Sequence, residues 1–202
     1  MRYDKAVLKA WAEMETWSQF LERNGAFGSN VSREGFKFIE QRYYKKVKKR
    51  IECCKRLLPE HDDFYMLYTL AELCNRGNLD DSAEYLFKRS VRYYCIKAIK
   101  KSPSYAPAWA LLAEAYEWVA CLGGDGKSIS EMETIINESN IIVQVSKKGS
   151  ELDPDQESIR FIEKAIRCLK KAVLLDPGNY KYERMLKNYY QYRFEEDERL
   201  FE

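Results

Sequence analysis

Residues 97–117 read KAIKKSPSYAPAWALLAEAYE, and this stretch decides the expected fold. Pro103 should end one helix near Lys101, and a second helix should begin at residues 105–106. On the second helix, spacings of three, one and three place four side chains on one face: Trp109, Leu112, Ala113 and Tyr116. The small alanine would let a neighbouring helix approach, while the larger side chains fill the gaps around it. The stretch therefore predicts two helices joined by a short turn and packed together.

The same arrangement recurs on both sides of this stretch. Residues 64–76 should form a helix ended by Gly77, with these side chains in the equivalent positions: Leu67, Leu70, Ala71 and Cys74. The helix after it is expected to include Ala83 and Phe87 and to run on to Pro103. Residues 158–176 should form a further helix, whose residues in the same register are Ala165, Leu169, Ala172 and then Pro177.

These patterns resemble the tetratricopeptide repeat (TPR), with its signature of Trp, Leu, Gly and Tyr in a first helix, Ala and Phe in a second, and then Pro. Trp109, Leu112 and Tyr116 match outright, and Ala113 stands in for the glycine. The resemblance covers residues 64–192 well, apart from an insertion, and extends weakly to residues 3–59. It implies an all-α fold, an α-α superhelix of about three helix pairs with a C-terminal capping helix.

One domain, residues 1–194, is expected, followed by an acidic C-terminal tail at residues 195–202. Pro103 and Pro177 are 74 residues apart, about 40 more than one repeat needs. An insertion at about residues 122–157 accounts for the excess, with a candidate helix at 130–138 and a candidate strand at 141–145. The remaining expected helices follow from apolar periodicity, and they span residues 3–23, 33–58 (capped by Ser32 and stopped by Pro59) and 180–193.

Composition excludes several classes of protein. The 202 residues are 46% hydrophobic and 33% charged with a net charge of +2, and no apolar run approaches the roughly 18 residues of a membrane span. Six cysteines without C-x2-C pairs, beside a single histidine, favour buried thiols in a reducing cytoplasm over a zinc site or a disulfide framework. The glycine-rich residues 123–128 lack the first glycine of a phosphate-binding loop and follow a helix, so we expect a plain loop there. We expect a cytoplasmic protein with no enzymatic activity, cofactor, metal or membrane segment.

The resemblance implies a concave groove lined by fixed positions of each first helix. In this sequence those positions are Tyr65, Tyr68, Glu72, Asn75, Arg76, Pro107, Ala110, Glu114, Glu117, Trp118, Lys181, Arg184, Asn188, Gln191 and Tyr192. Ala110 is expected to face the groove and tolerate a larger side chain, whereas Ala113 should lie where helices touch. Alternatively, the insertion or the N-terminal helix covers part of the groove.

Some members of the family bind the C-terminal carboxylates of chaperones through Lys and Asn residues in the groove. This chain has Tyr68, Glu72 and Leu111 at three of those positions. A glutamate there would repel a carboxylate, so we expect no such binding.

A second surface is the strongly basic segment 33–56, which holds ten basic and three acidic residues. Its expected basic face is made of Arg42, Lys45, Lys46, Lys48, Lys49 and Arg50. This face could bind RNA or an acidic protein surface, or it could be a solvated face that the acidic C-terminus neutralises.

The sequence thus predicts a non-catalytic interaction module (an adaptor, scaffold or assembly factor) that holds a partner peptide or helix in its groove. The alternative function is binding of RNA or an acidic surface through residues 33–56, and nucleic acid is the less favoured partner. The oligomeric state stays open.

Overall fold

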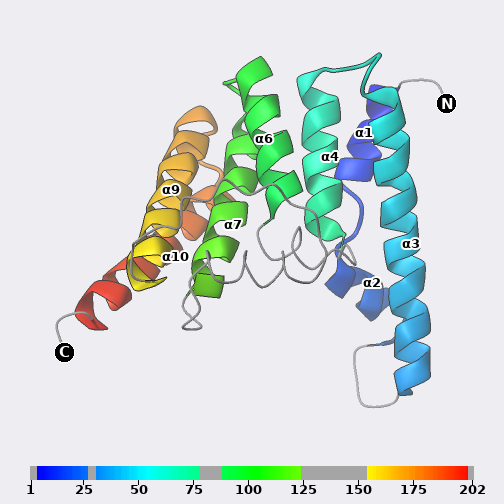
Figure 1. Cartoon of the computed structure of the whole chain (residues 1–202), viewed down its shortest axis with the longest axis horizontal. Helices are drawn as coiled ribbons and strands as arrows, with labels where there is room; N and C mark the ends of the chain where they lie inside the picture. Colours follow the sequence, from blue (N-terminus) through cyan, green and yellow to red (C-terminus); the bar gives the residue numbers. More distant parts are fainter. Residues whose placement is uncertain (1–3, 27–30, 78–87, 124–153, 200–202) are drawn as a thin grey trace.

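A computed structural model of the chain describes residues 4–26, 31–77, 88–123 and 154–199. Within these residues the structure has helices and no strand, so the prediction of an all-α fold is confirmed (Figure 1). The helices are α1 (Lys5–Ala12), α2 (Trp17–Arg23), α3 (Arg33–Leu57), α4 (Phe64–Arg76), α6 (Arg89–Lys101), α7 (Ala106–Gly123), α9 (Pro154–Leu175) and α10 (Tyr180–Arg199).

The helices stand side by side, largely in chain order, from α3, α1 and α4 at one end of the molecule to α9 and α10 at the other (Figure 1). Helix α4 packs against α1 and α3 on one side and against α6 on the other, and it also meets α7. Helix α7 packs between α6 and α9, and α10 covers α9. From α3 onward, the main packing partners are therefore helices that follow one another among the described elements, whereas α1 packs on α4.

The side chains that carry the sequence pattern form the interior of this stack. On α4 and α7, Leu67, Leu70, Ala71 and Ala113 are fully buried, as predicted. On α9, Ala165, Leu169 and Ala172 are fully buried as well. Trp109 is half-buried, and its Nε1 donates a hydrogen bond of 2.9 Å to the carbonyl oxygen of Pro103, which fixes the turn before α7.

Helix α6 begins later than expected. Lys88 precedes it with φ of +48°, in the left-handed region that a right-handed helix cannot contain. The prediction of one helix running from Ala83 and Phe87 to Pro103 is therefore wrong at its start, and those two residues lie outside the described part of the chain.

The residues that α6 does bury keep the second-helix register. Val91, Cys95 and Ala98 are buried, and they stand 12, 8 and 5 residues before Pro103. Ala165, Leu169 and Ala172 stand at the same three distances before Pro177. The two helices therefore present the same face to the interior with different side chains.

The N-terminal segment forms two helices where one was expected over residues 3–23. Thr16 accepts a hydrogen bond from the backbone N–H of Gln19 at 3.3 Å, and its own N–H donates to Gln19 Oε1 at 2.9 Å. This reciprocal cap starts α2 and ends any continuation of α1. The chain thus turns at residues 13–16, and Leu8 and Phe20 reach the core from different directions.

Two further helices match or exceed their expected lengths. Helix α3 begins after Ser32, whose Oγ accepts from the Gly35 N–H at 3.1 Å, and it ends before Pro59. Its buried residues, Tyr43, Val47, Ile51 and Cys54, stand three or four residues apart and so share one face of the helix. Helix α10 runs to Arg199, so residues 195–198 continue the helix instead of starting a tail at 195. The candidate helix at 130–138 and the candidate strand at 141–145 lie outside the described residues.

Candidate functional site

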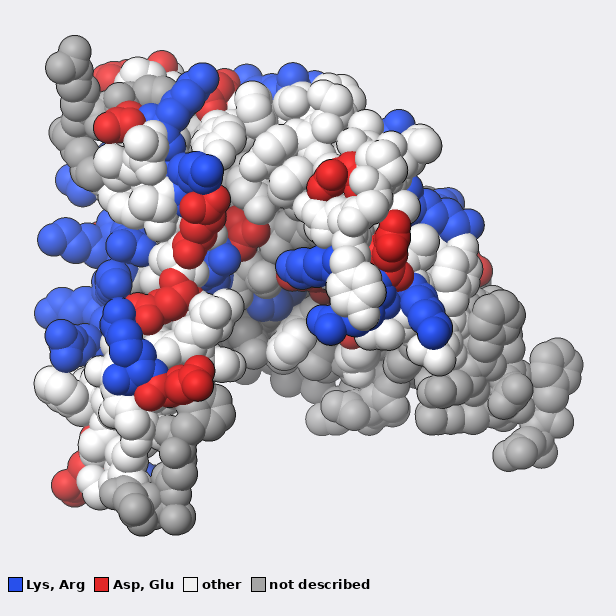
Figure 2. Space-filling model, turned by 180° about the vertical axis from the view of Figure 1, so that it is seen from behind, with Lys and Arg blue, Asp and Glu red and all other residues white. Residues whose placement is uncertain are grey.

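Two adjoining clefts lie on the side of the molecule shown in Figure 2, where charged side chains border its hollowed middle. The main cleft has a volume of about 510 Å³ and lies between α2, α3, α4 and α7. Its lining residues are Thr16, Trp17, Ser18, Tyr44, Asn75, Arg76, Lys88, Glu114, Glu117 and Trp118. The side cleft, of about 180 Å³, extends from the shared residues toward α10. Its lining residues are Thr16, Tyr68, Glu72, Asn75, Arg76, Pro107, Ala110, Leu111, Glu114, Lys181 and Tyr182.

Most of the residues assigned to a groove from the sequence meet at these clefts. Those that line one or both clefts are Tyr68, Glu72, Asn75, Arg76, Pro107, Ala110, Glu114, Glu117, Trp118 and Lys181. They come from three helices, α4, α7 and α10, that do not follow one another directly in the chain. The structure therefore places side chains separated by more than a hundred residues on one surface.

The other expected groove residues lie elsewhere. Tyr65 packs its ring against Phe64 and Tyr105 instead of lining a cleft. Arg184 is exposed and lies over the ring of Tyr180, 6.0 Å from its centroid. Asn188 and Gln191 are exposed and line neither cleft. The side chain of Tyr192 lies outside the described part of the structure.

Ala110 differs from expectation. It lines the side cleft, but only 4% of its surface is exposed. The side cleft is narrow and is bounded there by Leu111 and Tyr182, both of which are buried. Ala110 thus lies at a cleft, as expected, but little room surrounds its methyl group, so a larger side chain should be tolerated less well than the sequence suggested.

The N-terminal segment supplies one wall of the clefts. The turn at residues 13–16 is anchored by two side chains: Tyr43 donates its hydroxyl to the Glu15 carbonyl at 3.1 Å, and Arg76 donates Nε to the Met14 carbonyl at 3.1 Å. These bonds hold residues 16–18 against the clefts. The alternative that the N-terminus covers part of the groove thus applies at this end, and the only sequence signal for it was the apolar residue Trp17.

Charged groups in the side cleft pair with one another. Tyr68 donates its hydroxyl to Glu72 Oε1 at 2.6 Å, and Glu72 also forms an ion pair with Arg76 one turn along α4. Burial, reinforced by the charge of Glu72, raises the pKa of Tyr68, so the tyrosine stays a hydrogen-bond donor. Between helices, Lys181 of α10 forms an ion pair of 3.2 Å with Glu114 of α7.

The main cleft holds a buried lysine and a partly desolvated carboxyl. The ammonium of Lys88 lies 4.9 Å from the centroid of the Trp118 ring, and burial lowers the pKa of this lysine. Burial raises the pKa of Glu117, although the thiol of Cys121, which donates to Glu117 Oε1 at 3.5 Å, acts in the opposite direction. Lys88 was not among the expected groove residues, because it precedes α6 in the chain.

The basic face of α3 is exposed except at one residue. Arg42, Lys45, Lys48 and Lys49 are exposed, and Lys46 makes an ion pair of 3.8 Å with Glu15. The end of α10 lies at the opposite end of the molecule from α3 (Figure 1), so it is not placed to neutralise this face.

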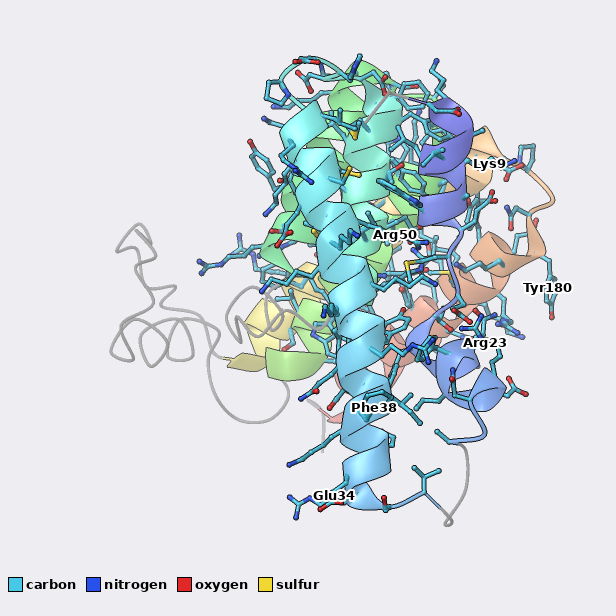
Figure 3. All side chains as sticks on the ribbon, turned by 90° about the vertical axis from the view of Figure 1, so that its right-hand side faces the viewer. Lys9, Arg23, Glu34, Phe38, Arg50 and Tyr180 are labelled. Carbon is cyan, nitrogen blue, oxygen red and sulfur yellow. The ribbon has the colours of Figure 1, made fainter. Side chains whose placement is uncertain are left out.

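Arg50 does not belong to this exposed face. Its guanidinium lies 5.8 Å from the centroid of the Trp11 ring, and its Nη1 donates to Met14 Sδ at 3.0 Å. Figure 3 shows Arg50 on the side of α3 that faces α1. Burial lowers its pKa. Arg50 therefore joins α3 to the N-terminal segment, unlike the exposed basic residues with which it was grouped.

Other chemistry has little support in the described residues. No group of three or more His, Cys, Asp or Glu side chains that could hold a metal ion occurs among them. In the same part of the chain, no helix is long and apolar enough to cross a membrane. The six cysteines are free thiols, of which Cys54, Cys74, Cys95 and Cys168 are buried. Comparisons of the chain with protein-family models, with curated proteins and with solved structures find no match.

Proposed function

We propose that this protein is a non-catalytic interaction module, an adaptor, scaffold or assembly factor, that holds a peptide or helix of a protein partner in the two clefts. The observation that carries the proposal is the convergence of groove positions from α4, α7 and α10 on one hollowed surface. Tyrosine and tryptophan beside both signs of charge suit a peptide ligand, since buried aromatic residues supply affinity and charges supply specificity.

We propose that the helices form a TPR-like α-α superhelix of about three helix pairs capped by α10. Two observations support this architecture. Helices α6 and α9 bury residues at the same distances before Pro103 and Pro177. Packing is also mostly between neighbours in the chain, which is the mark of a stacked repeat.

A peptide-display selection on the full chain tests the proposed function. The tightest selected peptide is labelled and titrated by fluorescence anisotropy against the unaltered protein, Trp118→Ala, and the control Tyr93→Ala on the exposed face of α6. We expect Trp118→Ala to weaken binding by about tenfold or more, while the control binds normally and both variants keep their circular dichroism spectra. No selectable peptide, or binding that does not depend on Trp118, would contradict the proposal.

A second candidate function is binding of RNA or an acidic protein surface by α3. Its support is an outward row of Arg42, Lys45, Lys49 and Arg56, which recur every three to seven residues and form no ion pair among the described residues. Binding of a poly-uridine oligonucleotide should then fall steeply as salt rises. Oligonucleotide binding should also be lost in the double variant Lys45→Glu/Lys49→Glu. It should be kept in the control double variant Lys170→Glu/Lys171→Glu on α9. Salt-independent binding would exclude this function.

The proposed location is the cytoplasm. Free thiols at all six cysteines favour a reducing compartment.

A further inference from the structure

One carboxylate in the two clefts forms no ion pair with the described residues. Arg76 pairs with Glu72, Lys181 pairs with Glu114, and the ammonium of Lys88 lies over Trp118. Among the described residues, Glu117 forms no ion pair, and its one hydrogen bond is the weak one from the Cys121 thiol. A carboxylate that is partly removed from water and forms no ion pair gains much from a positively charged ligand.

Aromatic rings line the same cleft as this carboxylate. Trp17 from α2 and Tyr44 from α3 are among the lining residues, with their ring centroids 5.6 Å apart. Trp118, the residue next to Glu117, already receives the Lys88 ammonium on its face. The faces of tryptophan and tyrosine attract cations, and most strongly where water is excluded. A carboxylate that shares a cleft with such rings is a combination that binds ammonium and guanidinium groups.

The same cleft is poorly suited to an anion. The cations on its walls are Arg76 and Lys88. Arg76 is held by the Glu72 carboxylate and by the Met14 carbonyl. Arg76 thus already has an anionic partner and Lys88 an aromatic one, whereas Glu117 has no cationic partner among the described ion pairs. This difference favours a positive ligand over a phosphate or carboxylate.

We infer that the main cleft receives a basic side chain, lysine or arginine, of the partner peptide. The Glu117 carboxylate is its counter-ion, and the rings of Trp17 and Tyr44 form the wall against which its stem or guanidinium lies. This inference rests on the proposed function and names the chemistry of the ligand for that same site. Arginine fits best, since its planar guanidinium can stack on a ring and pair with a carboxylate at once.

The test uses the full chain and peptides obtained by display selection. We expect the selected sequences to share a Lys or Arg at one position. In the tightest peptide, replacing that residue by norleucine, or by citrulline for arginine, should weaken binding by about ten- to a hundredfold in a fluorescence anisotropy titration. This arm leaves the protein unaltered, so its result does not depend on whether a variant folds.

A double-mutant cycle then assigns the effect to Glu117. Glu117→Gln should weaken the basic peptide about as much as norleucine does, and should leave the norleucine peptide's affinity unchanged. The control is Glu183→Gln, an exposed glutamate of α10 that lines neither cleft. It should bind both peptides normally.

The outcomes separate this inference from the proposed function. Selected peptides that lack a shared basic residue but still depend on Trp118 would overturn the inference and leave the proposed function in place. A basic residue whose replacement has no effect, or one that does not couple to Glu117, would also overturn it. If no peptide is selected at all, both the proposed function and the inference are wrong.

Discussion

Replacing Ala172 by leucine tests whether the register set by Pro177 describes the packing of α9. Ala172 is fully buried in the core, on a helix that packs against α7 on one side and α10 on the other. Leucine adds three carbon atoms where no exposed surface remains to receive them, so neighbouring side chains or whole helices must shift. Overpacking of this kind costs typically about 1–3 kcal/mol. For a chain of 202 residues, that cost lowers the thermal midpoint by roughly 2–12 °C.

The matched control is Lys171→Leu, one residue earlier on the same helix, where the side chain is exposed. It introduces the same leucine with the same helix propensity, and its free energy of unfolding should stay within about 0.5 kcal/mol of the original. Urea titrations followed by circular dichroism measure both variants. Equal midpoints for the two, or a lower midpoint for Lys171→Leu, would show that α9 presents a different face to the interior and would refute the register.

Three more variants test individual contacts. Tyr68→Phe removes the 2.6 Å hydrogen bond to Glu72 and should cost about 1–3 kcal/mol in a urea titration; no loss would mean that the bond is not formed in solution. Arg50→Ala should lower the free energy of unfolding by about 1 kcal/mol or more through lost packing. Replacement of the exposed Lys49 by alanine should leave it unchanged. Equal unfolding midpoints for the two variants would show that Arg50 is solvated like the rest of the basic face. The folded-state pKa of Glu117 is raised, so its ionisation opposes folding above its unfolded pKa. Glu117→Gln should therefore be more stable than the original at neutral pH, and this advantage should disappear as the pH falls below about 4; a constant difference across that range would contradict the assignment.

The sequence predicted the helices because their signals are local. The period of the apolar residues, the prolines at 59, 103 and 177 and the cap at Ser32 set α3, α4, α7 and α9 close to their observed bounds. The same period identified the buried faces, since a helix turns each residue by a fixed angle. The helix of residues 3–23 was mispredicted despite its helical spacing, because a reciprocal cap at Thr16 outweighed the apolar period.

The candidate site depends on contacts between distant segments, and for that reason only part of it could be predicted from the sequence. The resemblance to a repeat supplied the positions on α4 and α7, but the wall at residues 16–18 exists because Arg76 bonds to Met14, 62 residues away. Arg50 packs on the N-terminal segment in the same way, across 36 residues. Such contacts depend on how whole helices pack against one another. A hydrophobic period shows which side of a helix is buried, and only the tertiary structure decides which segment buries it.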